Sequence, residues 1–132
     1  MPLTLEIVTP QERALTVTCD EVRATGVAGG FGIRPGHTPL VAALQPGELA
    51  YVTGGQVHRF AVGEGFAEVA DDRVRILVEE AFRAEELDRD QVRRELEDRR
   101  KRLAAMHEGD PEYNTVRASV ERSAARALVV GH

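Results

Sequence analysis

GELAYVTGGQVHRFAVGEGFAEVADDRVRILV, residues 47–78, holds four short apolar runs separated by turn residues. Gly54-Gly55 predicts a tight hairpin, because glycine adopts positive φ without steric cost. Asp71-Asp72 occupies the same kind of position, and Gly63-Glu64-Gly65 marks a further turn. The stretch therefore predicts four consecutive strands, Glu48–Val52, Gln56–Val62, Phe66–Ala70 and Arg73–Val78.

The residues before this stretch show the same kind of pattern. Leu3, Leu5 and Ile7 alternate with polar residues, as in a half-buried strand, and 40–44 is a further candidate strand. Many short strands with regular turns and no helical period are typical of a sandwich or barrel. We therefore expect a β-sandwich domain over residues 1–85. Its core must be aliphatic, because the chain has no Trp, four Phe and two Tyr.

A helical pattern replaces the strand pattern after Glu85. Asp88, followed three residues later by Gln91, resembles a capping box at a helix start. Gly109 is expected at the C′ position that ends this helix. The apolar stripe between them consists of Val92, Leu96, Leu103 and Met106.

A second helix is expected to begin at Asp110-Pro111, with aspartate as N-cap and proline at the first helical position. Each helix spans about 18 residues, or roughly 27 Å at 1.5 Å per residue. Matched lengths and a short loop predict an antiparallel α-helical hairpin over residues 86–132. Its narrow stripes bury little area, so we expect the sandwich to hold it weakly. The second stripe consists of Tyr113, Val116, Val120, Ala124 and Ala127 or Leu128.

Charge and composition argue against several classes of protein. Residues 1–85 carry 12 acidic and 7 basic side chains and residues 86–132 carry 10 of each, so nucleic acid is not an expected partner. The first residues lack the basic and apolar regions of a signal peptide, and no run reaches the roughly 18 apolar residues of a membrane span. Cys19 is the single cysteine, which rules out an internal disulfide. We expect a bacterial cytoplasmic protein without direct membrane insertion.

The segment Gly29–Leu40 is the most unusual in composition. A glycine-rich loop can cradle phosphate, but this one lacks the Lys-Ser/Thr ending of a P-loop and no helix is expected after it. We interpret it as a shaped turn or interaction loop. The four histidines and Cys19 show no metal-ligand spacing, and no nucleophile has a recognisable base. We therefore expect no catalytic residue, no metal site and no enzyme activity in this chain.

Arginines are concentrated on both expected helices, among them Arg117, Arg122 and Arg126 on the second. One interpretation is pairing at i,i+4 spacing with acids such as Glu95 and Glu121, at a few tenths of a kcal/mol per pair. The other is a surface for an acidic partner. The residues alone favour neither interpretation.

The segment FGIRPGHTPL, residues 31–40, followed by Leu44-Gln45-Pro46-Gly47, resembles the signature of the epsilon subunit of F-type (rotary) ATP synthases. The opening strand at 5–10, the stretch 65–80 and the helix start at Leu87-Asp88 are similar to that family as well. The resemblance covers essentially the whole chain in order. It implies a β-sandwich followed by a two-helix domain, which agrees with the pattern described above.

The resemblance further implies a non-catalytic subunit of the central stalk, which links the gamma subunit to the c ring and couples ion translocation to ATP synthesis. The candidate contacts with gamma and the c ring are Phe31, Arg34, His37 and Pro39. Gly29-Gly30 stands where relatives often place an acid toward the c ring, so no charge contact is expected there. The implied location is the cytoplasmic face of the bacterial plasma membrane, peripheral through the complex.

Regulation is implied by the helical hairpin. In this family the hairpin folds against the sandwich or extends along gamma, where it inhibits ATP hydrolysis and meets acidic segments of the beta subunits. Arg117, Arg122 and Arg126 are the candidate contacts with beta. Such a mechanism needs two states of similar free energy, which a weakly held hairpin supplies.

Some bacterial relatives bind ATP between the two helices and the sandwich. The resemblance implies Asp88, Arg122 and Arg126 as candidate contacts with this regulatory ATP. Gln91-Val92 stands where the family motif has Arg-Ala, and Asp98 replaces a later arginine, so guanidinium donors are missing.

Three hypotheses therefore compete. The first is a coupling and inhibitory rotor subunit that does no bond chemistry. The alternative is a free-standing nucleotide-sensing binding module, which predicts ATP affinity and a compact monomer without partners. The third is a plain scaffold whose hairpin never extends, so that truncation before Glu86 would leave ATP hydrolysis unchanged.

Overall fold

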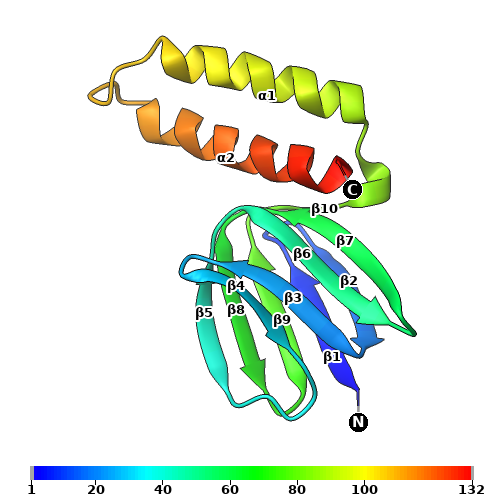
Figure 1. Ribbon diagram of the computed structural model, residues 1–132. Helices are drawn as coiled ribbons and strands as arrows, with labels where there is room; N and C mark the ends of the chain where they lie inside the picture. The colour runs from blue at the N-terminus through cyan, green and yellow to red at the C-terminus, as the bar shows by residue number, and fades with distance from the viewer. Residues whose placement is uncertain (1, 132) are drawn as a thin grey trace.

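The computed structural model describes residues 2–131 as a β-structure covered at one end by two helices (Figure 1). The prediction of a β-sandwich followed by a helical hairpin is confirmed. The elements are β1 (Leu3–Val8), β2 (Arg13–Cys19), β3 (Glu21–Gly26), β4 (Gly29–Ile33), β5 (Leu40–Leu44), β6 (Gly47–Thr53), β7 (Gln56–Val62), β8 (Gly65–Ala70), β9 (Arg73–Val78), β10 (Ala81–Arg83), a 3-10 helix (Ala84–Glu86), α1 (Arg89–Ala104) and α2 (Tyr113–Val130).

The strands form one continuous sheet that folds into two layers. Their order is β10-β7-β6-β3-β5-β8-β9-β1-β2, and β4 pairs with β3. The sheet folds over between β3 and β5, which share the single residue pair Gly26 and Leu44. One layer therefore holds β3, β4, β6, β7 and β10, and the other holds β5, β8, β9, β1 and β2 (Figure 1).

The core lies between the layers and follows the alternation of the strands. Leu3, Leu5 and Ile7 are fully buried, and so are Val74 and Ile76 on the neighbouring strand β9. The core is largely aliphatic, as the composition predicts. Burial of this apolar surface, at about 25 cal/mol per Å², is the main force that holds the two layers together.

Both predicted two-residue hairpin turns are present. Gly54 and Gly55 have φ of 56° and 78°, and Asp71 and Asp72 have φ of 52° and 59°. Positive φ at both central residues gives a turn whose twist matches that of the flanking strands. The turns join β6 to β7 and β8 to β9, and both β7 and β9 have the bounds that the sequence predicts.

The glycine-rich segment is more regular than predicted. Residues Gly29–Ile33 form β4, paired along its length with β3, so the interpretation of all of 29–40 as a loop is wrong for its first five residues. Pairing with β3 hydrogen-bonds one edge of β4 and makes it a strand, although its three glycines give no alternating pattern. The loop itself is limited to residues 34–39.

The helix ends agree with the sequence at one terminus and differ at others. The Asp88 carboxylate accepts a hydrogen bond from the Gln91 amide at 2.9 Å, so the predicted N-cap of α1 is confirmed. The expected end at Gly109 is wrong, because α1 ends at Ala104. The second helix begins at Tyr113, later than predicted, because the Asp110 carboxylate accepts from the His107 amide within the connecting turn.

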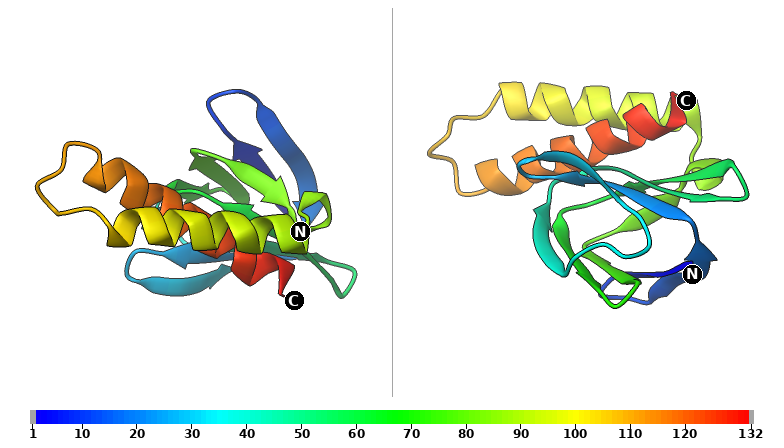
Figure 2. Two further views of the ribbon diagram at one scale, coloured as in Figure 1. Left: turned by 90° about the horizontal axis from the view of Figure 1, so that it is seen from above. Right: turned by 60° about the horizontal axis from the view of Figure 1, so that its bottom comes forward.

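The helix α2 lies between α1 and the layer that contains β6 and β7 (Figure 2). It therefore buries two sides, and Ser123, Ala125 and Val129 are buried beside the predicted Val116. The single narrow stripe expected from the sequence therefore accounts for only part of the buried surface of α2. Leu128, an expected stripe residue, is exposed. Within residues 2–131, no helix combines the length and apolar character needed to cross a membrane.

Candidate functional site

Two arginines of α2 tie the hairpin to the sandwich. The Arg122 guanidinium donates from Nε to Glu64 Oε1 at 2.9 Å and from Nη2 to Glu64 Oε2 at 3.0 Å. Glu64 lies in the turn between β7 and β8. Hydrogen bonding to Arg122 lowers the pKa of the Glu64 carboxyl below its ordinary value, and the same pairing raises the pKa of Arg122. The charged forms of both groups are therefore favoured at this contact.

Arg126 makes the second contact, one helical turn further along α2. Its Nε donates to Glu80 Oε2 at 3.0 Å, and Nη2 reaches the same oxygen. Nη1 lies 3.8 Å from Glu95 of α1, and the guanidinium carbon lies 4.9 Å from the centroid of the Phe82 ring. Arg126 thus connects α2 to both the sandwich and α1. We call Arg122–Glu64 and Arg126–Glu80 the interface ion pairs.

The helices are also held to each other by polar contacts. Arg89 donates to the carbonyl oxygen of Val130 at 2.9 Å, and Arg99 donates to the hydroxyl of Ser123. Several arginines therefore pair across the hairpin or with the sandwich. Pairing at i,i+4 spacing along one helix is present for Arg117, which lies 3.9 Å from Glu121, and both side chains of this pair are exposed.

The three candidate ATP contacts do not form an open anion site. The Asp88 carboxylate caps α1, while Arg122 and Arg126 are bound to carboxylates of the sandwich. A cleft of about 350 Å³ brings Asp88 and Arg126 together, but Glu86 and Glu95 also line it. Three carboxylates against one guanidinium, already paired, repel a polyphosphate.

The four candidate contacts with gamma and the c ring are divided among three places. Phe31 and His37 line a largely apolar cleft of about 560 Å³ beside the β3–β4 turn, and His37 Nδ1 lies 2.7 Å from the Thr38 carbonyl oxygen. Pro39 lines a separate cleft, over β5, β8 and β9. Arg34 pairs with Glu21 at 2.9 Å. The structure therefore brings Phe31 and His37 together but not the four residues.

A neighbouring turn anchors this loop. The backbone amide of Gly36 donates to Asp72 Oδ1 at 2.7 Å, which ties the loop to the β8–β9 turn. Gly36 has φ of 83°, a conformation that side chains with a Cβ rarely adopt. The loop shape therefore depends on a glycine and an aspartate that lie 36 residues apart in the chain.

The exposed face of the layer β5-β8-β9-β1-β2 is a feature that sequence reasoning missed. We call it the outer face. Cross-strand pairing aligns Ala43 with Phe66, Phe66 with Leu77, and Leu77 with Val8, which makes an apolar row across four strands. The side chain of Phe66 is 54% exposed although it is large and apolar. The sequence signal for this exposure was the position of Phe66 directly before Ala67. Neighbouring residues of a strand point to opposite faces of the sheet, and Ala67 is buried.

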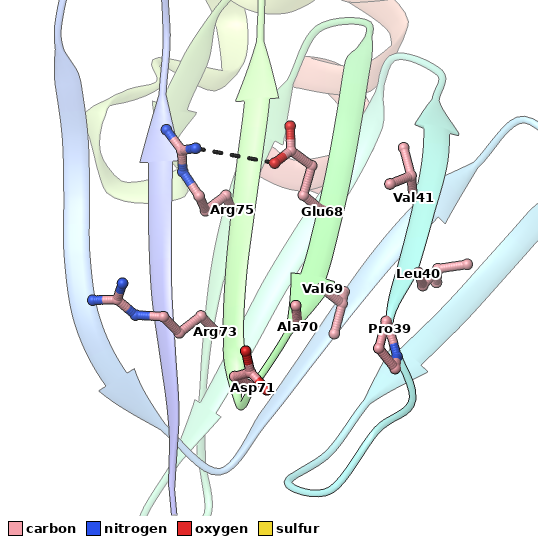
Figure 3. Close-up of a pocket in the computed structure, with 9 residues that line it drawn as sticks. All are labelled: Pro39, Leu40, Val41, Glu68, Val69, Ala70, Asp71, Arg73 and Arg75. Carbon is pink, nitrogen blue, oxygen red and sulfur yellow. Dashed lines mark ion pairs between the residues drawn. The ribbon is translucent and has the colours of Figure 1, made fainter.

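A second row crosses the outer face beside the first. It contains Val41, Glu68, Arg75 and Glu6, aligned by the same pairings. Figure 3 shows the cleft of about 520 Å³ on this face, with Val41 on β5 and with Arg73 and Arg75 extending from β9 toward β1. Val41 is 72% exposed. The outer face therefore offers apolar groups beside paired charges, since Arg75 lies 3.1 Å from Glu6 and 4.0 Å from Glu68.

Within residues 2–131, no group of three or more His, Cys, Asp or Glu side chains is placed to hold a metal ion. Cys19 is buried in the core, and burial raises the pKa of its thiol. The contacts described above are those of a binding and positioning surface, made of ion pairs, apolar clefts and exposed rows.

Comparison with known proteins gives consistent matches along the chain. Residues 2–84 match the family described as ATP synthase, Delta/Epsilon chain, beta-sandwich domain. The ATP synthase epsilon chain of Anaeromyxobacter dehalogenans strain 2CP-1 is 50% identical over 131 residues, which cover 99% of each chain. That of Geobacter metallireducens is 40% identical over 129 residues, which cover 98% of this chain and 94% of the relative.

A solved structure has the same fold over nearly all of the chain. It is the cryo-EM structure of the Euglena gracilis mitochondrial ATP synthase, OSCP/F1/c-ring in rotational state 1. A chain of that assembly matches with a TM-score of 0.78 and 23% identity, over 98% of this chain and 81% of its own length.

Proposed function

The chain belongs to the family of ATP synthase epsilon chains, and from this premise we propose that it is a non-catalytic subunit of the central stalk of an F-type ATP synthase. The subunit links the gamma subunit to the c ring and so couples ion translocation to ATP synthesis. The family assignment carries this proposal, since 50% identity extends over sandwich and hairpin alike. The alternative of a free-standing nucleotide-sensing module is not favoured by these relatives.

The contacts with gamma and the c ring are assigned to the sandwich. The apolar cleft with Phe31 and His37, and the cleft with Pro39, supply concave apolar surface of the kind that protein interfaces use. Gly36 and Asp72 fix the loop that presents His37 and Pro39. The complex holds the subunit at the cytoplasmic face of a bacterial plasma membrane, through protein contacts alone.

The hairpin is the regulatory part of the proposed function. In the docked state of this structure, Arg122 and Arg126 are occupied by Glu64 and Glu80. When the hairpin leaves the sandwich, both guanidinium groups become free for acidic segments of the beta subunits, together with the exposed Arg117. The two sets of contacts are mutually exclusive, which gives a two-state element of the kind that a switch requires.

The test is ATP hydrolysis by a matched catalytic head prepared without this chain. Full-length protein should inhibit hydrolysis, while a version that ends at Glu85 should not, because it lacks both helices. Equal inhibition by the two would contradict the regulatory role of the hairpin. Binding of neither form to the head would contradict the central-stalk assignment itself.

A parallel measurement addresses regulatory ATP. With Asp88 used as a helix cap and both arginines paired, the docked state is stabilised without nucleotide. Millimolar ATP should therefore leave the thermal midpoint of the isolated chain unchanged, since a ligand stabilises only through preferential binding to the folded state. A rise in the midpoint with ATP concentration would favour the nucleotide-sensing alternative.

A further inference from the structure

The two antiparallel helices (Figure 1) meet along an apolar seam that is interrupted once. On α1 the residues of this seam follow one another at alternating spacings of 4 and 3, as in a coiled coil. Arg99 occupies the middle position of this row, where an apolar residue is usual. A row of the same spacing runs along α2, and Ser123 lies in its middle. The seam consists of Val92, Leu96, Arg99, Leu103 and Met106 on and just after α1, and of Val116, Val120, Ser123, Ala127 and Val130 on α2.

The interruption is a hydrogen bond between the two helices. Nη1 of Arg99 donates to the hydroxyl of Ser123. Ser123 is 1% exposed, and among residues 2–131 it is the only buried serine, threonine, amide or charged side chain. Arg99 is half-buried, and within the same residues it makes no ion pair. A partly desolvated guanidinium is therefore held by one hydroxyl and by no carboxylate, which is a costly arrangement for a helix interface.

This contact restricts how the helices can align. Residues 105–112 connect them, and sliding α2 by one helical turn would move it by about 5.4 Å. Such a slide would place Val120 or Ala127 opposite Arg99, and neither side chain can accept a hydrogen bond. Only the native register supplies an acceptor to the half-buried cation, so the Arg99–Ser123 contact disfavours the neighbouring registers.

The same contact lowers the free energy needed to separate the helices. Arginine at a seam position forgoes the apolar burial that leucine would give there. Separation also offers Arg99 a charged partner, because Glu95 lies one turn earlier on α1. Glu95 is 3.8 Å from Arg126 across the interface and loses this neighbour when α2 leaves. Glutamate four residues before arginine is the favourable order for an i,i+4 pair.

We propose that the Arg99–Ser123 contact is a polar layer in the hairpin, which fixes the register of α1 and α2 and keeps their association weak enough to open. A single polar residue in the seam of a coiled coil specifies alignment at a cost in stability. The inference concerns the hairpin itself, so it does not depend on the proposed function. That function gives the layer a use, since Arg126 is free of both Glu80 and Glu95 only when α2 parts from α1 as well as from the sandwich.

The first experiment measures amide hydrogen exchange in α1 and α2 of the full-length chain. The variants are Ser123→Ala, Arg99→Leu and the combination of the two, which makes the seam wholly apolar. The matched controls are Ser119→Ala, whose hydroxyl donates to the Val116 carbonyl of its own helix at 2.7 Å, and Arg100→Leu at an exposed position. Both controls should exchange as the wild-type chain does.

Ser123→Ala should speed exchange in both helices about fivefold or more, because it leaves the guanidinium without an acceptor. Arg99→Leu should slow exchange several-fold, because it removes a half-buried charge and extends the apolar seam. Once Arg99 is replaced, adding Ser123→Ala should have little effect, since the two side chains act as a pair. Unchanged exchange in β1 and β9 verifies that the sandwich is intact in each variant.

The second experiment measures the register as the distance between spin labels at the exposed positions Lys101→Cys and Arg117→Cys. Cys19 is buried, so the labels attach to the two introduced thiols. One distance is expected with the native seam. The wholly apolar seam should add a second distance that differs by several Å, as a slide of one turn gives.

Two results would overturn the polar layer. Equal effects of Ser123→Ala in the presence and absence of Arg99, or faster exchange in Arg99→Leu, would show that the contact does not weaken or pin the hairpin. A single, unchanged label distance in the wholly apolar seam would show that the register is set elsewhere.

Discussion

The ion pair between Arg126 and Glu80 should control how often the hairpin leaves the sandwich. Its side chains are 13% and 23% exposed, less than those of the Arg122–Glu64 pair, so solvent screens it less. Glu80→Gln keeps the shape and one acceptor oxygen but removes the charge. A hydrogen bond to a charged group contributes about 1 to 1.5 kcal/mol more than a neutral one, so the detached population should rise roughly tenfold.

Amide hydrogen exchange measures this population, because α2 amides exchange through local detachment while strand amides need wider unfolding. We expect roughly tenfold faster exchange in α2 of Glu80→Gln, with exchange in β1 and β9 unchanged. The matched control is Glu97→Gln, the same chemical change at an exposed position of α1. The combination with Arg126→Gln should cost less than the sum of the two single changes, as expected for groups in contact.

Two results would refute this reasoning. Unchanged α2 exchange in Glu80→Gln would show that the ion pair does not hold the hairpin. Equal acceleration in α2 and in the core strands would show that the substitution destabilises the whole domain instead. In the hydrolysis assay, a more readily released hairpin should make Glu80→Gln a stronger inhibitor than the wild-type chain.

Other predictions concern pH, thiol chemistry and turn strain. The pKa of Glu64 is lowered in the folded protein, so its contribution to stability is present above its unfolded pKa and is lost as pH falls through the folded one. Acid should therefore lower the protection of the α2 amides, measured relative to their intrinsic exchange rate at each pH, and Glu64→Gln should remove this part of the pH dependence. Cys19 is buried with a raised pKa, so a thiol reagent should label it only after unfolding by denaturant; fast labelling of the native chain would contradict the core assignment. Asp71→Gly should raise the free energy of unfolding by about 0.5 to 1 kcal/mol in urea titration, because φ is positive there. Asp72→Gly should gain less or lose stability, because its carboxylate holds the Gly36 amide.

The elements with strong local signals were predictable from the sequence. Apolar runs between turn residues located β7 and β9, and the turn residues themselves located the hairpins at Gly54-Gly55 and Asp71-Asp72. The strand β4 was missed, since its three glycines have no apolar alternation and only pairing with β3 makes it a strand. The end of α1 and the start of α2 were misplaced, because Asp110 caps the connecting turn instead of the second helix.

In the candidate site, too, some features were predictable from the sequence and others were not. The sequence indicated that Arg122 and Arg126 matter, but their carboxylates lie 58 and 46 residues away and no local pattern connects them. The outer face was invisible for the same reason, since its apolar row takes one residue from each of four strands.

The sequence by itself thus determined the β-sandwich, the helical hairpin, the principal turns and the family, because propensity, periodicity and motifs are properties of neighbouring residues. Only the tertiary structure decided which arginine meets which carboxylate and which apolar residues line up across the sheet. Those contacts depend on strand register and on the docking of α2 against β6 and β7, both of which are set by packing between distant parts of the chain.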